Sequence, residues 1–347
     1  MDFKNIITAL LCFVSFFTLA EADVQTVQAI DKIEKTIHFK GFDSSEIIYK
    51  GDILPFADYD SWLSDVKENT RQLRFIDNFA RTINPIKYNN FRPKIEAQWI
   101  EYQSDGLKIS GAMLFPKESE IDQKLPVLIY NRGGNAATPL SREAIANKLM
   151  VFAAKGYIVL ASNYRGSRFS EGKDEYGGAD VNDVLRLIEI SKTIAKVDTQ
   201  RIAMMGWSRG AQMTYQALRA NHKDIKAAII GAGVTDQFAE LTRRPDMETN
   251  IFEQYVPDFK NTRQQALQKR SALFWADEIS PTTAILLLHG TSDWRVDVSN
   301  SLSIAKKFDE LNHVYKLVTY PHGDHSLTFF NEQHQNEVFD WLDKHLK

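Results

Sequence analysis

The residues that could do chemistry begin with a serine between two glycines, Gly206-Trp207-Ser208-Arg209-Gly210. This G-x-S-x-G pattern follows an apolar run at 202–205 and opens a helical pattern, the context in which it marks a nucleophile on a sharp turn. A side chain at either glycine would collide with neighbouring backbone. The turn would lift the Ser208 hydroxyl clear and direct the N-terminus of the next helix at a developing oxyanion. Alone, the motif also fits an ordinary tight turn.

A serine hydroxyl becomes a good nucleophile only when an oriented base removes its proton. Asp293 follows an apolar strand pattern at 284–288, and His325 follows a second one at 315–320. Carboxyl ends of parallel strands meet at one edge of a sheet, where the Ser208 turn also lies. The order nucleophile, acid, histidine therefore predicts acyl transfer, with Ser208, Asp293 and His325 as candidates.

The same two loops hold competing residues. His322 could replace His325 as the base. Asp297 could replace Asp293, although it stands where a helix should begin and favours an N-cap. His322, Asp324 and His325 could together suggest a metal site, but three ligands within four residues rarely converge. We predict no metal and no cofactor.

The elements that must position these residues alternate from residue 95 onward. Short apolar runs predict strands, and amphipathic segments between them predict helices. The alternation indicates an α/β fold, a mostly parallel sheet with helices on both faces. The predicted strands are 95–103, 107–115, 126–131, 157–163, 201–205, 225–230, 284–288 and 315–320. The predicted helices are 141–155, 181–195, 208–220, 298–311 and 332–346.

Two segments fall outside this rhythm. Residues 23–94 hold one helical stretch, 59–83, and predict a helical arm or accessory segment before a catalytic domain at 95–347. Residues 234–281, rich in charge and aromatic side chains, interrupt the sheet pattern. We call them the insertion, and expect short helices over the strand ends as a partial lid.

Five motifs in order resemble the catalytic domain of the prolyl oligopeptidase family of serine peptidases, within the α/β-hydrolase superfamily. The resemblance covers roughly residues 95–347. It implies Ser208 as nucleophile, Asp293 as acid and His325, rather than His322, as base. The matching motifs are Asn163-Tyr164-Arg165-Gly166-Ser167, the Gly206–Gly210 turn, Arg270-Ser271 with 276–279, the 289–296 pattern H-G-x-x-D-x-x-V, and the histidine loop 320–325.

The chain departs from the family pattern in the early turn. Members often place a tyrosine before paired glycines, where its hydroxyl helps bind the oxyanion; here Arg132 precedes Gly133-Gly134. The Arg209 backbone N–H is the expected first oxyanion donor, and Arg132 and Gly133 are candidates for the second. Arg165 is expected to organise loops. Residues 23–92 are too few to form the β-propeller of the large family members. A peptidase acting on short peptides is the expected function, and an esterase is the alternative.

Composition bounds the alternatives. Among 347 residues, 44% are hydrophobic, which is enough for a packed core and excludes general disorder. Lys and Arg number 42 against 45 Asp and Glu, so the net charge of −3 gives no case for nucleic-acid binding. The single cysteine, Cys12, excludes disulfide scaffolds and thiol catalysis from the remaining chain.

Residues 1–22 combine Lys4, an apolar run at 6–20 and Ala20-Glu21-Ala22. This pattern predicts a secretory signal peptide cleaved after Ala22, with an uncleaved anchor as the alternative. We therefore expect an exported, periplasmic or secreted serine hydrolase without a membrane span after cleavage, acting on a small peptide or acyl substrate. A catalytically inactive binding protein is the alternative of a different class. The oligomeric state is not predicted.

Overall fold

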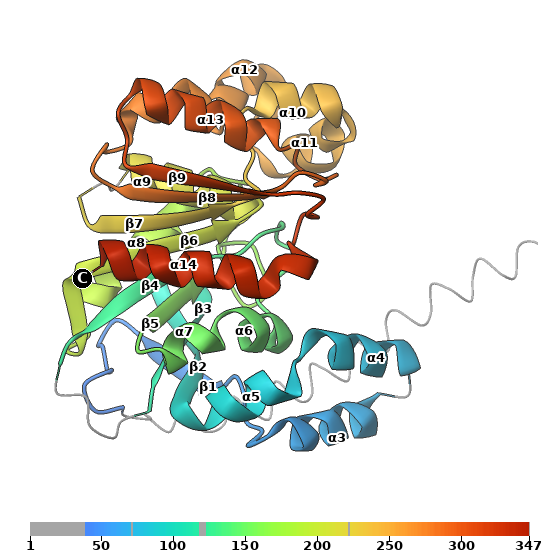
Figure 1. Ribbon diagram of the computed structural model, residues 1–347, viewed down its shortest axis with the longest axis vertical. Coiled ribbons are helices and arrows are strands. Elements are labelled where there is room, and N and C mark those ends of the chain that lie inside the picture. The colour runs from blue at the N-terminus through green and yellow to red at the C-terminus, as the bar shows by residue number, and fades with distance from the viewer. Residues whose placement is uncertain (1–38, 71, 118–122, 221–222, 347) are drawn as a thin grey trace, which may run out of the picture. The chain divides into compact units, whose positions relative to one another are not determined.

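A nine-stranded sheet runs through the computed structural model, which describes residues 39–70, 72–117, 123–220 and 223–346 (Figure 1). The predicted signal peptide lies outside these residues. The strand order is β1-β2-β3-β5-β4-β6-β7-β8-β9. The strands are β1 Ile48–Asp52, β2 Ile95–Ser104, β3 Leu107–Pro116, β4 Leu125–Asn131, β5 Ile158–Ser162, β6 Val197–Trp207, β7 Ile225–Gly231, β8 Ala284–Gly290 and β9 Tyr315–Tyr320.

The sheet is antiparallel at one side and parallel through its remainder. β1, β2, β3 and β5 pair antiparallel in turn, whereas β5 through β9 pair parallel. Asp105 and Gly106, both with positive φ, join β2 to β3 in a two-residue hairpin turn. All residues of β5 and β8 are buried, as continuous apolar runs require when helices cover both faces. The predicted α/β class is confirmed.

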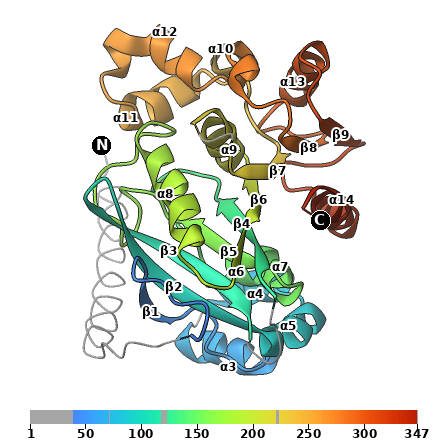
Figure 2. The ribbon, with the colours of Figure 1, turned by 90° about the vertical axis from the view of Figure 1, so that its left-hand side faces the viewer.

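Helices cover the two faces of the sheet with separate hydrophobic cores (Figure 2). One core includes side chains of α8, α9 and α13, and the other includes side chains of α3 to α7 and α14. The helices outside the insertion are α3 Tyr59–Asn69, α4 Leu73–Thr82, α5 Pro85–Phe91, α6 Arg142–Lys148, α7 Met150–Ala154, α8 Asp180–Lys192, α9 Arg209–Ala220, α13 Ser299–Glu310 and α14 Asn331–His345. None of the described helices is long and apolar enough to cross a bilayer.

The segment before residue 95 contributes more than a helical arm. β1 pairs with β2 and adds an edge strand that the sequence did not reveal, because its exposed residues lack an apolar alternation. The helical stretch at 59–83 is two helices, since Thr70 and Gln72 are extended. Trp62, Phe79 and Tyr88 pack in the second core, so residues 39–94 share one compact unit with the rest of the described chain.

The predicted helix at 141–155 is likewise divided, at Leu149, into α6 and α7. The insertion is helical as expected. Its helices are α10 Gln237–Arg243, a π-helical turn Glu248–Phe252, α11 Glu253–Tyr255, α12 Phe259–Lys269 and two 3-10 turns, Ala272–Phe274 and Ala276–Glu278. Leu241, Phe252, Phe259 and Leu267 form a small core of its own. In Figures 1 and 2 its helices lie beside α13 at one end of the sheet.

Candidate active site

Ser208 occupies a strained turn between β6 and α9. Its φ is 58°, in the left-handed region that non-glycine residues rarely adopt. Its N–H donates to Gly231 O at 2.9 Å. A Cβ on Gly206 would lie 2.0 Å from Gly210 O, and one on Gly210 would lie 2.0 Å from Asn131 O. Both positions therefore have room only for glycine, as the motif predicts.

The structure brings the predicted acid and base together. His325 Nδ1 lies 2.7 Å from Asp293 Oδ2, and both side chains are buried. Trp207, the residue before Ser208, donates its indole N–H to His325 O at 2.6 Å. This bond holds the histidine loop against the nucleophile turn, although the two lie 118 residues apart in the chain.

Hydrogen bonds keep Asp293 ionised. Burial by itself would raise the pKa of its carboxyl, but hydrogen bonds from His289, His325 and the Val296 N–H, with the charge of His325, hold that pKa well below its ordinary value. His289 Nε2 lies 3.0 Å from Val296 O and 3.3 Å from Asp293 Oδ2. Because a carbonyl only accepts, Nε2 carries the proton, and Nδ1 accepts from Ser301 Oγ at 2.7 Å.

The competing residues make local contacts. His322 is exposed, and its backbone N–H donates to Thr291 Oγ1. Asp297 accepts the N–H of Ser299, the first residue of α13, as a residue at a helix start does. The Asp324 carboxylate accepts from the backbone and side chain of Thr328. These contacts favour His325 and Asp293 as the base and acid. Within the described ranges, no three His, Cys, Asp or Glu residues cluster as metal ligands.

The early turn after β4 lies against the nucleophile. A Cβ on Gly133 would sit 3.1 Å from Trp207 O and 3.5 Å from Ser208 Cβ. The Tyr164 hydroxyl donates to Arg132 O at 3.0 Å. In a trans peptide unit the C=O and the N–H point in opposite directions, so the Gly133 N–H points away from Tyr164.

The Arg132 side chain stabilises this turn through hydrogen bonds to backbone carbonyls. It is buried, and its three guanidinium nitrogens donate to Asn163 O, Gly133 O and Asn135 O at 2.6 to 3.1 Å. It also stacks on the Tyr164 ring, 4.6 Å from the centroid. Since all three nitrogens donate to carbonyls, the guanidinium holds the turn, and the Gly133 N–H remains the candidate donor to an oxyanion.

Sequence reasoning did not find the buried partners of the Arg209 side chain. Its guanidinium donates to Gly134 O at 2.9 Å, to Asp174 at 2.6 and 2.7 Å, and to Asp180. Burial opposes its charge, but these two carboxylates raise the pKa of Arg209 above the ordinary value. The available signal was a basic residue after the serine together with Asp174 in a glycine-rich loop and Asp180 at the start of α8. Charged residues in such positions usually face solvent, so the signal is weak.

Arg165 joins distant segments through hydrogen bonds. It donates to both oxygens of Asp183 on α8, at 2.7 Å for the shortest contact, and to Asp105 in the β2–β3 turn at 2.7 Å. These contacts fit the loop-organising role expected of it.

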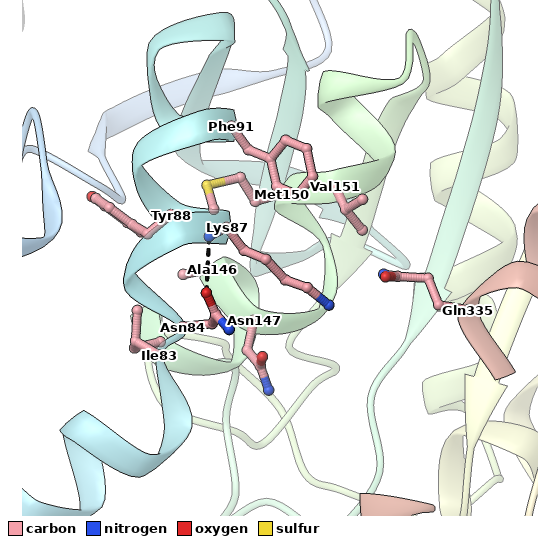
Figure 3. A pocket seen from close by; sticks show the side chains of 10 residues that line it. All are labelled: Ile83, Asn84, Lys87, Tyr88, Phe91, Ala146, Asn147, Met150, Val151 and Gln335. Atoms are coloured by element: carbon pink, nitrogen blue, oxygen red, sulfur yellow. Dashed lines mark hydrogen bonds between the residues drawn. The ribbon is translucent and has the colours of Figure 1, made fainter. Parts of the chain in front are cut away.

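A small cavity lies apart from these residues, between α5, the α6–α7 pair and α14 (Figure 3). Tyr88, Met150 and Gln335 are among its lining residues. Its volume of about 20 Å³ has room for about one water molecule. It is therefore a gap in packing and too small for an acyl substrate.

Known proteins share this chain's sequence pattern. The chain is 26% identical over 272 residues to the uncharacterized peptidase YuxL of Bacillus subtilis, covering 71% of this chain and 39% of YuxL. It is 24% identical over 212 residues to the uncharacterized peptidase YtmA of the same species, covering 61% of this chain and 79% of YtmA. The chain thus spans about two fifths of the length of the first relative.

Solved structures share the fold. Pyrococcus horikoshii acylaminoacyl peptidase matches with a TM-score of 0.61 at 21% identity, over 73% of this chain and 42% of that one. The family model described as the prolyl oligopeptidase family matches residues 144–347, which include Ser208, Asp293 and His325. Because that match covers more than half of the 347 residues, the chain belongs to the prolyl oligopeptidase family.

Proposed function

We propose that this protein is an exported serine hydrolase that works through an acyl-enzyme intermediate, and that it is a peptidase acting on short peptides. The observation that carries the proposal is the 2.7 Å bond between Asp293 and His325, in a loop tied to the strained Ser208 turn. Family membership and the peptidase names of the two Bacillus relatives support peptide bonds as substrates.

In this mechanism His325 removes the proton of Ser208 Oγ as that oxygen attacks a carbonyl carbon. Asp293, held ionised, orients the imidazole and stabilises the imidazolium that forms. His325 then gives its proton to the leaving amine, which departs and leaves an ester on Ser208. Water, deprotonated by His325, releases the acyl group and restores the serine hydroxyl.

Backbone amides are the proposed donors to the tetrahedral oxyanion. The Arg209 N–H is the first of α9, and the first four N–H groups of a helix have no intrahelical partner. The Gly133 N–H is the second, because its turn lies against Ser208 and is fixed by Tyr164 and Arg132. Donors held in place before the reaction cost no reorganisation during it.

A matched substrate panel tests the peptidase assignment. We expect the purified protein to hydrolyse aminoacyl and dipeptidyl amides, with a kcat/KM that depends on the acyl residue. p-Nitrophenyl esters with the same acyl groups provide the comparison. Turnover of simple esters without any turnover of amides would assign the same residues to an esterase instead.

Export is tested at the N-terminus. If residues 1–22 are a cleaved signal, the mature protein isolated from the extracytoplasmic fraction should begin at Asp23. Edman or mass-spectrometric sequencing gives the answer directly. Recovery of the protein with its first 22 residues intact would favour a retained anchor.

A further inference from the structure

We propose that Arg243, on α10 of the insertion, is a positioning residue that fixes the carboxylate of Asp293. The inference rests on the proposed function, since it assigns Asp293 the role of catalytic acid. Arg243 lies 50 residues before Asp293 in the chain, and within the described residues it donates to Glu240, Trp294 and Arg295 rather than to that carboxylate. It acts through the backbone that holds the carboxylate.

Asp293 Oδ1 accepts two backbone hydrogen bonds, from the Arg295 N–H at 2.8 Å and from the Val296 N–H at 3.0 Å. The carbonyls of the same two peptide units are those of Trp294 and Arg295. Arg243 donates to Trp294 O at 3.0 Å and also to Arg295 O. Its guanidinium therefore caps both peptide units whose N–H groups hold Asp293.

The geometry makes these contacts cooperative. In each trans peptide unit the carbonyl faces the guanidinium while the N–H faces the carboxylate. A cation at the carbonyl end polarises the unit and strengthens the bond that its N–H donates. Arg244 adds a second donor to Arg295 O at 3.3 Å. The loop at 291–298, which carries Asp293 and is called the acid loop here, is thus held between a cation on the insertion and the Asp293 anion.

Glu240 fixes the guanidinium in turn. Its Oε1 accepts from Arg243 at 2.7 Å, and its side chain is only 1% exposed. A buried carboxylate of this kind is retained only with a partner, so Arg243 has little freedom to leave. The Arg243 side chain is itself 32% exposed, but its removal would leave the buried Glu240 carboxylate without this partner, so stability is measured beside activity.

A merely structural ion pair is the competing explanation, and the chain offers a matched control. Arg219 donates twice to Glu278, at 2.6 Å each, and its side chain is 33% exposed. This pair joins α9 to the end of the insertion, and within the part of the chain that the structure describes neither side chain hydrogen-bonds the acid loop. Arg219→Gln therefore removes a guanidinium of similar exposure, with a partner carboxylate that is 48% exposed, and should not influence Asp293.

The test uses the full mature chain and the rate of covalent labelling by a fluorophosphonate, which needs no knowledge of the natural substrate. We expect Arg243→Gln to lower the maximal labelling rate by about 10- to 100-fold with little change in probe affinity, because a misplaced catalytic group costs rate. Arg243→Lys, which can still donate to a carbonyl, should recover part of the loss. Arg219→Gln should stay within about twofold of wild type.

A double-mutant cycle shows whether Arg243 acts through Asp293. If it does, Arg243→Gln should cause little further loss in an Asp293→Asn background, because coupled residues are not additive. Full additivity, an equal loss in Arg219→Gln, or a loss confined to probe affinity would overturn the inference. If Arg243→Gln fails to fold, the Lys variant carries the same comparison. An unaffected Asp293→Asn would instead contradict the proposed function itself.

Discussion

Replacing Ser208 by alanine is expected to abolish covalent labelling by a fluorophosphonate probe and to lower turnover by about 10⁴- to 10⁶-fold. The reason is that no other group in the proposed mechanism can form the acyl ester. The left-handed φ of 58° penalises serine and alanine alike, so the variant should fold. Gel fluorescence of the labelled protein and initial rates on the amide panel measure the two effects.

The matched control is Ser292→Ala. Ser292 is exposed and stands beside Asp293 in the acid loop, where its backbone N–H donates to Gly323 O. Its hydroxyl has no part in the mechanism, so this variant should label like wild type. A correctly folded wild-type protein that takes no label would instead identify the inactive binding protein considered as the alternative class.

Replacing Asp293 by asparagine should lower kcat by about 10⁴-fold while the fold persists. An amide can present its NH₂ to His325 Nδ1, which then favours the tautomer that cannot accept the Ser208 proton at Nε2. Because the amide carries no charge, it would also no longer stabilise the imidazolium. Initial rates of the purified variant measure the expected loss of activity, and circular dichroism shows whether the variant remains folded.

Asp297→Asn is the control for this variant. Asp297 accepts the N–H of Ser299 at the start of α13, and asparagine caps helices about as well as aspartate. The activity of Asp297→Asn should therefore remain within about threefold of wild type, because the exchange barely changes the start of the helix. A large loss in Asp297→Asn together with a small loss in Asp293→Asn would exchange the two assignments.

The depressed pKa of Asp293 adds a pH dependence. Its carboxyl titrates lower in the folded than in the unfolded protein, where the value is about 3.9. The folded state therefore gains stability from this group above about pH 4, and loses it as the pH falls through the folded value. The difference in unfolding free energy between wild type and Asp293→Asn should shrink below about pH 4. Urea titrations at several pH values measure it.

Local patterns were enough to predict much of this protein. The buried strands β5 and β8 were predicted to within two residues, because solid apolar runs between turn signals have few other structures to adopt. The Ser208 turn was predicted because its motif has glycine at the two positions where neighbouring backbone leaves no room for a side chain. The three candidate residues were expected at one edge of the sheet because the carboxyl ends of parallel strands meet there.

Other features depend on contacts between segments far apart in the chain. β1 has no apolar alternation and becomes a strand only because β2 offers an open edge. The Arg209 pair with Asp174 is equally invisible in sequence, where arginine and aspartate usually indicate a solvated surface. Arg243 reaches carbonyls 51 and 52 residues away, and backbone carbonyls carry no sequence signature.

The fold class, the serine turn and the loops that carry Asp293 and His325 can all be predicted from residue types, because each depends on a short span of the chain. The contact between Asp293 and His325 is observed only in the folded chain, where Asp297 and His322 make other contacts. The same holds for the hydrogen bonds by which Arg132 supports the early turn. Side-chain direction on a loop is set by the segments packed around it. Those segments come together only when the chain is folded.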